Sequence, residues 1–241
     1  METKGYAWKE VWADGSVHYC DTEGFLHRED GPALEWPDGT TEWYRHGDLH
    51  REGGPAYERA DGSKEWYRNG KKHREDGPAI DYVDGSKEWY REGKLHREDG
   101  PAVEKADGTK EWWVDGRRHR LDGPAFEWAN GSKEWWVNGQ RHREDGPAIE
   151  EADGPRKWYR NGRLHREDGP AIEWANGTRM WYRDGDPHRE DGPAFEMADG
   201  RKEYWLSGNN VTESDFRALH PEAFASSPVE KKRKAKTPGI G

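Results

Sequence analysis

The polar and apolar residues of this chain follow a pattern that repeats every 23 residues. Histidines stand at 27, 50, 73, 96, 119, 142, 165 and 188, and most of them open the string "HREDGPA". Tryptophans recur at the same step from 43 to 181, and Tyr204 takes the eighth place. A partial unit precedes these eight units. A fixed period of this length is typical of repeat proteins, in which each unit packs on its neighbours.

Within each unit, apolar and acidic residues alternate as a half-buried β-strand requires. The column that starts at Leu34 is apolar in every unit, and the column that starts at Glu35 is acidic in every unit. Two turn signals bound the strands, as at Asp84-Gly85 and Glu92-Gly93. Such pairs tolerate φ > 0 at both central positions, which a type I′ turn needs. We therefore expect two antiparallel strands per unit.

Two-residue turns also predict which residues face each other. Ile80 is expected opposite Trp89, Trp89 opposite His96, and Tyr90 opposite Leu95. Each histidine should then lie on the indole of the facing tryptophan, and "EDG" should form a turn in which glycine supplies φ > 0. The predicted fold is all-β, an elongated single-layer antiparallel β-hairpin repeat sheet. Its repeat array, one partial plus eight full units, covers residues 1–210.

The pattern ends before the chain does. In the segment 211–224, Thr212 and Asp215 resemble a capping box, and Phe216 and Leu219 share one helical face. This predicts a short C-terminal capping helix that covers the last strand. Residues 225–241 have no apolar period and are predicted to be a disordered basic tail. The tail residues that could contact nucleic acid are Lys231, Lys232, Arg233 and Lys234.

The chain is acidic and rich in aromatic residues. It carries a formal net charge of -10, 15 Trp and 10 Tyr, and one cysteine. The aromatic content argues against disorder, and the acidic charge argues against nucleic-acid or anionic membrane binding outside the tail. A single cysteine excludes a disulfide framework. Because we find no apolar run long enough for a membrane span and no signal peptide, we predict a cytoplasmic protein, or a nuclear one in a eukaryotic host.

The repetition itself argues against an active site. Catalysis needs an asymmetric group of residues, whereas the histidine, arginine and acids recur in every unit. Equivalent histidines stand two strands apart, about 9.6 Å at ~4.8 Å per strand, which is too far to share a zinc ion. Cys20 and His18 make only a thin case for a nucleophile and its base. We predict no enzyme activity, no catalytic residue, no metal site and no cofactor.

The turns and the period resemble those of the MORN-repeat family. Asp61-Gly62 and Asn69-Gly70-Lys71 match the family's turn motifs, and the resemblance covers about residues 6–210. The glycine that usually separates two aromatic residues is replaced within "KEWYR", and "HREDGPA" replaces the spaced glycines. The resemblance implies a single-layer twisted β-meander. This variant is similar to uncharacterised bacterial and bacteriophage proteins, which suggests a phage-encoded inhibitor of a host or defence protein.

Two columns vary in residue type while the frame around them stays fixed. They carry tryptophan, tyrosine and arginine, the residues that dominate protein interfaces. We therefore predict a non-enzymatic repeat scaffold that binds a protein partner through an aromatic and arginine-lined face. The alternatives are a groove binder of a small or nucleotide-like ligand, and a structural or self-association module. The predicted partner-binding residues are Trp36, Tyr82, Trp113, Trp128, Trp136, Trp174 and Tyr182.

Overall fold

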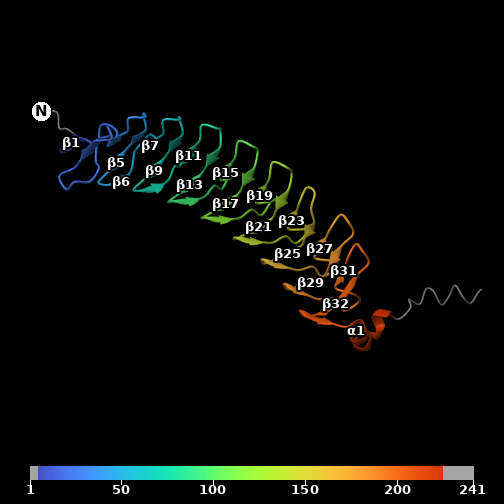
Figure 1. The fold of residues 1–241 in the computed structure, drawn as a ribbon. Coiled ribbons are helices and arrows are strands. Elements are labelled where there is room, and N and C mark those ends of the chain that lie inside the picture. Colours follow the sequence, from blue (N-terminus) through green and yellow to red (C-terminus); the bar gives the residue numbers. More distant parts are fainter. Residues whose placement is uncertain (1–4, 225–241) are drawn as a thin grey trace, which may run out of the picture. The chain divides into compact units, whose positions relative to one another are not determined.

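Two hairpins per repeat build the fold, as the alternation predicts. The structure is a computed structural model and describes residues 5–224. Its described part is β-structure apart from a short helix and a 3-10 turn at the end (Figure 1). The chain falls into two compact units, Met1–Gln140 and Arg141–Gly241, and each is described by itself. The antiparallel hairpin meander within each unit is consistent with a MORN-like repeat fold.

The first hairpins of successive repeats form a continuous antiparallel ladder in each unit. In the first unit its strands are β1 (Trp8–Val11), β2 (Val17–Cys20), β3 (Leu34–Glu35), β4 (Thr41–Glu42), β7 (Tyr57–Glu58), β8 (Lys64–Glu65), β11 (Ile80–Asp81), β12 (Lys87–Glu88), β15 (Val103–Glu104), β16 (Lys110–Glu111), β19 (Phe126–Glu127) and β20 (Lys133–Glu134). In the second unit they are β23 (Ile149–Glu150), β24 (Arg156–Lys157), β27 (Ile172–Glu173), β28 (Arg179–Met180), β31 (Phe195–Glu196), β32 (Lys202–Leu206) and β33 (Asn209–Val211).

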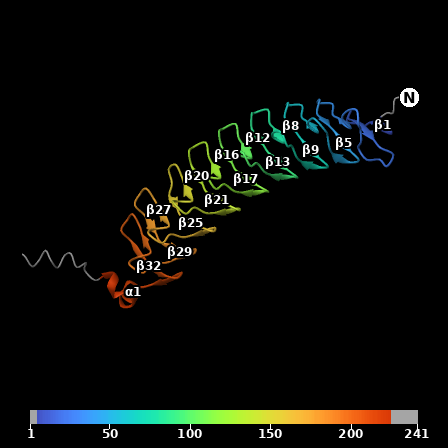
Figure 2. The same cartoon turned by 180° about the vertical axis from the view of Figure 1, so that it is seen from behind.

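The second hairpin of each full repeat but the last is a separate two-stranded ladder beside the first (Figure 2). These strands are β5 (Tyr44–Arg45), β6 (Asp48–Leu49), β9 (Tyr67–Arg68), β10 (Lys71–Lys72), β13 (Tyr90–Arg91), β14 (Lys94–Leu95), β17 (Trp113–Val114), β18 (Arg117–Arg118), β21 (Trp136–Val137), β22 (Gln140–Arg141), β25 (Tyr159–Arg160), β26 (Arg163–Leu164), β29 (Tyr182–Arg183) and β30 (Asp186–Pro187). Two-residue strands offer few backbone hydrogen bonds, so side chains must supply much of the cohesion between repeats.

The first turn of each repeat holds three residues, which corrects the predicted register. Tyr82 N–H donates to Ser86 O at 2.9 Å, and Gly85 has φ +89° while Asp84 has no positive φ. This is a three-residue hairpin loop that ends in a left-handed glycine, not a type I′ turn. Ile80 consequently pairs with Glu88 instead of Trp89. The predicted row Ile80–Trp89–His96 is therefore wrong at its first step, and Glu88 shares a face with Ile80.

The second turn is a two-residue turn as predicted. Glu92 has φ +50° and Gly93 has φ +78°, so both central residues are left-handed, as a type I′ turn requires. Tyr90 pairs with Leu95, which confirms this half of the predicted register. The His96 N–H donates to Trp89 O at 3.0 Å, so these two residues do lie opposite each other across the hairpin.

The core is thin and consists of two columns of side chains. Ile80 is fully buried, and its column is buried or half-buried in every repeat. An alanine column beside it is fully buried throughout and comprises Ala33, Ala56, Ala79, Ala102, Ala125, Ala148, Ala171 and Ala194. The alanine column takes part in the main-chain ladder, since Trp89 N–H donates to Ala102 O at 2.8 Å.

In six of the repeats an arginine, not a histidine, covers the indole. Arg97 Cζ lies 4.1 Å from the centre of the Trp89 ring. Its Nε donates to Asp99 at 2.8 Å, and its Nη1 donates to Pro101 O at 3.2 Å and to Glu104 at 3.0 Å. The same stack, at 3.8–4.1 Å, forms on Trp43, Trp66, Trp112, Trp158 and Trp181. The recurring arginine, acids and proline are thus parts of one clamp.

The motif histidine joins its repeat to the next one. His96 Nδ1 accepts the N–H of Asp115 at 3.1 Å, and Asp115 opens the second turn of the following repeat. The equivalent bond measures 3.1–3.2 Å at all eight histidines. The acceptor role requires the tautomer that carries its proton on Nε2. The prediction that histidine lies on the indole is therefore wrong, because its ring is turned toward the neighbouring turn.

The glycine of "EDG" makes room for the arginine and does not supply a positive φ. Gly100 is absent from the described residues with φ > 0. A Cβ at this position would lie 2.9 Å from Arg97 Cζ, closer than such atoms approach. The expected left-handed turn is therefore wrong, and the string needs glycine because the guanidinium folds back over it.

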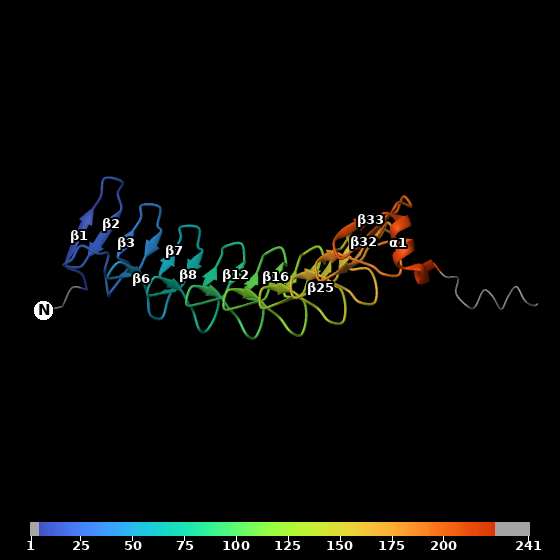
Figure 3. The ribbon, with the colours of Figure 1, turned by 90° about the horizontal axis from the view of Figure 1, so that it is seen from below.

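A short helix closes the second unit, as predicted. Helix α1 (Glu213–Leu219) begins after Thr212, whose Oγ1 accepts the Asp215 N–H at 3.1 Å, and the turn η1 (Pro221–Phe224) follows. Helix α1 lies beside β32 (Figure 3). Phe216 is fully buried, and its ring lies 4.9 Å from that of Tyr204 in β32. Leu219 is 63% exposed, so the expected shared packing face is wrong; His220 stacks on Phe216 instead.

The clamp geometry predicts a coupled effect of two substitutions. Gly100→Ala should lower the free energy of unfolding by about 1 kcal/mol, because the added methyl displaces the Arg97 guanidinium from Trp89. In an Arg97→Ala background the same glycine substitution should cost little, and urea unfolding of the four proteins of this cycle measures the difference. An equal cost in both backgrounds would contradict the clamp.

The clamp aspartates predict a loss of stability in acid. The hydrogen bond from Arg97 lowers the pKa of Asp99, and the equivalent arginines lower the pKa of Asp76, Asp122, Asp145 and Asp168. A lowered folded-state pKa contributes stability above the ordinary value of about 3.9 and loses it as the pH falls through the folded value. A variant with these five aspartates changed to Asn should melt below the native protein at pH 7, and the gap should close toward pH ~2.5. A gap that stays constant would refute the assignment.

Candidate protein-binding face

The predicted partner-binding residues of the first unit lie on one face of its ladder. Paired residues, and residues two apart in a strand, share a face. Ile80, Tyr82, Glu88 and Tyr90 meet this condition, because Ile80 pairs with Glu88 and both tyrosine hydroxyls donate to the Glu88 carboxylate. We call this side the aromatic face. By repeat equivalence it carries Trp36, Tyr82, Trp113, Trp128 and Trp136 in the first unit and Trp174 and Tyr182 in the second.

A row of glutamates runs between the two aromatic columns and holds their polar atoms. Trp36 Nε1 donates to Glu42 at 2.8 Å, and Tyr44 donates its hydroxyl to the same carboxylate at 2.6 Å. Trp113 Nε1 donates to Glu111 at 3.0 Å in the same way. Each glutamate therefore fixes the orientation of neighbouring rings. A two-residue first turn, with Ile80 opposite Trp89 as the sequence predicts, would put this row on the opposite face; the pairing of Ile80 with Glu88 puts it here.

The most buried of these glutamates is fully compensated. Glu65 is 3% exposed and accepts hydrogen bonds from Arg59 at 2.7 Å and Tyr67 at 2.9 Å, with Lys72 at 3.5 Å. Burial alone would raise the pKa of Glu65, but these cations and hydrogen bonds outweigh it and hold the pKa below its usual value. Burial and the bond to Glu65 raise the pKa of Tyr67. The face is thus charged yet internally paired.

The variable column changes together with the glutamate row. In one repeat of the first unit the row holds Glu65, and the variable column six residues earlier holds Arg59. In the second unit the row holds Lys157 and the variable column holds Glu151, with Lys157 Nζ 2.7 Å from the Glu151 carboxylate. The two charges are exchanged, and the pair remains oppositely charged. Part of the variation in this column therefore maintains ion pairs within the sheet and is not explained by an external partner.

Aromatic side chains gather around Arg118 near the end of the first unit. Arg118 Cζ lies 5.1 Å from the Trp113 ring, 4.6 Å from Phe126 and 5.5 Å from Trp136. The rings of Phe126 and Trp128 are 3.9 Å apart. One guanidinium near three rings, with Trp128 against one of them, presents the residue types that dominate interface energies.

In the second unit, Trp174 lacks the glutamate that holds the indole of Trp36. Trp174 is 44% exposed, and the residue six positions after it is Met180, which cannot accept its indole N–H as a glutamate does. The Tyr182 ring lies 5.7 Å from Phe195, and burial raises the pKa of Tyr182. Lys231, Lys232, Arg233 and Lys234 lie outside the described residues.

One cluster in the first unit has the composition of a metal site. Asp21, His27 and His46 each offer a ligand atom within 4.8 Å of the others. His46 Nδ1 is 2.8 Å from Asp21, and His27 Nδ1 already accepts the His46 N–H at 3.2 Å. His27 can therefore ligate an ion only if the bond that joins these repeats is given up. The cluster is the local form of the repeated histidine contact. It forms where the second turn of the partial unit, closed by the bond from the Asp21 N–H to Phe25 O at 2.9 Å, holds three residues instead of two.

The cysteine does not have the environment of a nucleophile. Cys20 is buried in β2, and burial, aided by Asp21 and Glu10, raises the pKa of its thiol. His18 is engaged elsewhere, with its ring stacked on Trp12 at 4.3 Å and its Nε2 2.9 Å from Ser16 Oγ. A thiol kept protonated in this way is a weak nucleophile.

No protein-family model and no curated protein matches this chain. Among the residues that the structure describes, none of the helical segments has the length and hydropathy to cross a bilayer.

The reversed pair predicts a rescue experiment on the aromatic face. Lys157 Nζ now lies 2.7 Å from a Glu151 oxygen. Lys157→Glu should lower the melting temperature, because it replaces this ion pair with two neighbouring carboxylates. The double variant Glu151→Lys with Lys157→Glu should recover most of the loss, because it restores the opposite charges. Differential scanning calorimetry compares the native protein, Lys157→Glu and the double variant, and a double variant no more stable than Lys157→Glu would contradict the pairing.

Proposed function

We propose that this chain is a non-enzymatic repeat scaffold that binds a partner protein through the aromatic face. The observation that carries the proposal is the double column of tryptophan and tyrosine rings whose polar atoms are held by the glutamate row. A ring with a fixed orientation loses little conformational entropy when a partner packs on it. Tryptophan, tyrosine and arginine are also the residues that contribute most to binding energy at interfaces.

The recurring residues and the variable residues have different roles in this proposal. The histidine, arginine, aspartate and glycine of each repeat are occupied by contacts within the fold, as Arg97 and His96 illustrate. The two aromatic columns differ from repeat to repeat, so they offer a surface that is distinct at each position along the array. Burial raises the pKa of the Cys20 thiol, which argues against the pair of Cys20 and His18 as a nucleophile and its base.

The sequence variant adds a biological setting to the proposal. The HREDGPA form of the repeat is similar to bacterial and bacteriophage proteins, and inhibition of a host or defence protein in the cytoplasm would use a binding face of this kind. This setting rests on the resemblance alone, and the binding face does not depend on it.

The proposal predicts the effect of removing one exposed ring. Trp174→Ala should weaken a partner captured from cells of the native host by roughly 30-fold, corresponding to ~2 kcal/mol for a hot-spot residue, because Trp174 is exposed on the aromatic face. Phe25→Ala is the matched control, since Phe25 is 52% exposed but lies outside both aromatic columns. Biolayer interferometry with the purified partner measures both affinities.

A shortened chain separates the face from the tail. Removal of residues 225–241 should leave the affinity for this partner unchanged. If binding is lost with the tail and unaffected by Trp174→Ala, the aromatic face is not the binding site and the proposal fails.

A further inference from the structure

Where two repeats join, three side chains meet beside the second turn. In one junction of the first unit, Arg68 Nη2 lies 2.6 Å from the Glu92 carboxylate and 3.3 Å from His73 Nδ1. The same set of arginine, histidine and acid recurs as Arg91, His96 and Asp115, and in the second unit as Arg160, His165 and Asp184. Such a junction does not suit a metal ion, because its guanidinium neutralises the acid and repels a second cation.

The junction between the partial unit and the first full repeat has a carboxylate in place of this guanidinium. Asp21 stands at the arginine position, and His46 stands at the turn position that holds Glu92 in the junction above. His46 Nδ1 lies 2.8 Å from Asp21 Oδ2, and the rings of His27 and His46 are 4.3 Å apart. Among the junctions of the described residues, this is the only one whose three positions all carry side chains that bind transition metals.

The Asp21 carboxylate is held in place by its own turn. Its Oδ1 accepts the N–H groups of Glu23 and Phe25, both at 3.0 Å. This leaves Oδ2 directed toward His46. A carboxylate whose other oxygen is hydrogen-bonded is oriented before an ion arrives, as ligating carboxylates in metal sites are.

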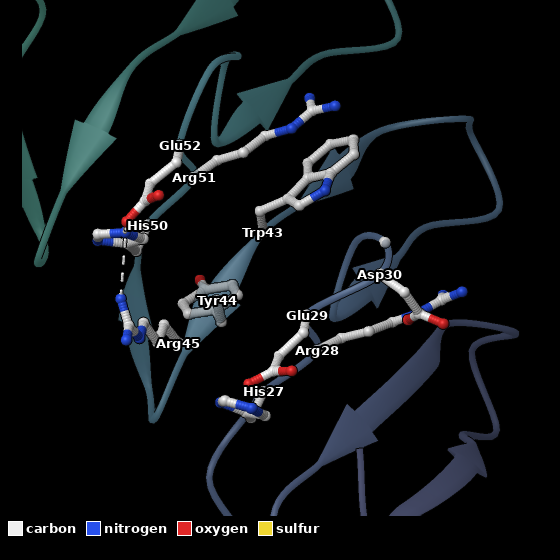
Figure 4. A pocket seen from close by; sticks show the side chains of 11 residues that line it. His27, Arg28, Glu29, Asp30, Trp43, Tyr44, Arg45, His50, Arg51 and Glu52 are labelled. Atoms are coloured by element: carbon white, nitrogen blue, oxygen red, sulfur yellow. Dashed lines mark hydrogen bonds and ion pairs between the residues drawn. The ribbon is translucent and has the colours of Figure 1, made fainter. Parts of the chain in front are cut away.

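Solvent can reach the cluster. The side chain of His46 is 68% exposed, so its ring can adjust its position. Asp21 and His27 line an open pocket of about 310 Å³. Glu29 lines the same pocket, and Figure 4 shows its side chain together with that of His27. Three protein ligands leave one position of a tetrahedral ion, which water or Glu29 can fill.

Ligation by His27 costs one hydrogen bond. Its Nδ1 accepts the His46 N–H at 3.2 Å, so its proton is on Nε2, and ligation through either nitrogen gives up this bond. The His46 N–H belongs to an exposed turn, where water can replace the imidazole. The loss of one such bond lowers the affinity for an ion by about tenfold. The ion's bonds to three protein ligands outweigh this loss.

We propose that Asp21, His27 and His46 bind a divalent transition-metal ion, with Zn²⁺ the best match. Two imidazoles and a carboxylate suit zinc, whose ligand atoms stand about 3.4 Å apart for bonds of ~2.0–2.1 Å, and the three ligand atoms here lie within 4.8 Å of one another. Ca²⁺ and Mg²⁺ prefer oxygen ligands. The sequence argument against zinc concerned equivalent histidines, and His46 is not equivalent to His27.

The ion would tie the partial unit to the first full repeat. The partial unit begins with β1, which is exposed throughout, and terminal repeats have one neighbour fewer to stabilise them. The site contains none of the residues of the aromatic face, so the proposal does not depend on the function proposed above.

Isothermal titration calorimetry with ZnCl₂ tests the proposal on the full chain, freed of metal with EDTA and without an affinity tag. One Zn²⁺ should bind per chain, and excess Ca²⁺ should not displace it. NMR should show zinc-dependent shifts of the ring nitrogens of His27 and His46 among the 11 histidines, and faster exchange of the His46 amide. Absence of binding, displacement by Ca²⁺, or shifts confined to other histidines would overturn the proposal.

Three variants locate the site. His46→Asn should weaken Zn²⁺ binding roughly 100-fold without unfolding the turn, because the equivalent positions hold Asn69, Asn138 and Asn161. Asp21→Asn should weaken it similarly, since its amide oxygen can still accept the turn N–H groups.

Glu23→Gln is the matched control, since it removes the same charge from the same turn and should leave the affinity unchanged. The melting temperature of each variant without zinc reports whether its fold is intact. Native affinity in His46→Asn, or equal weakening by Asp21→Asn and Glu23→Gln, would overturn the assignment of the site.

Discussion

The hydrogen bond from a turn N–H to a histidine Nδ1 of the preceding repeat is the contact on which this architecture depends. The strands of most hairpins are two residues long, so the backbone ladder alone joins the second hairpins of neighbouring repeats weakly. The bond from the Asp115 N–H to His96, repeated at all eight histidines, fixes each second turn against the repeat before it. The arginine clamp acts beside it within the repeat, since Arg97 binds Asp99 and Glu104 while it covers Trp89. Together they explain why a polar string recurs without forming an active site.

Much of the fold was predictable from the sequence, because equivalent positions of the repeats can be compared with one another within the one chain. The period, the two hairpins, the type I′ turn at Glu92-Gly93 and the capping helix after Thr212 follow from spacing and turn chemistry. The register of the first hairpin was not predictable from the Asp-Gly pair, because the same dipeptide serves two-residue and three-residue loops. Because the loop holds one residue more than predicted, Glu88 lies on the face of Ile80. Every residue between the two turns is therefore on the face opposite to the predicted one relative to Ile80.

The candidate site was predictable in its residues but not in its chemistry. Variation against a fixed frame pointed to Trp36, Tyr82 and the equivalent positions, and they do share a face. The glutamates that bind the aromatic side chains form a nearly constant column in the sequence. Only the pairing of Ile80 with Glu88 shows on which face of the sheet they lie. The reversal of Arg59–Glu65 into Glu151–Lys157 could have revealed the contact, since two columns six residues apart change sign together.

Amide hydrogen exchange, measured by NMR on the native protein, tests the central claim most directly. Glu92 and Asp115 lie in solvent-facing two-residue turns, where an amide without a partner exchanges rapidly. The account predicts that their N–H groups are protected, because His73 and His96 accept them at 3.2 Å and 3.1 Å. Exchange of these amides at the rate of unstructured peptide, in a protein whose ladder amides remain protected, would contradict it.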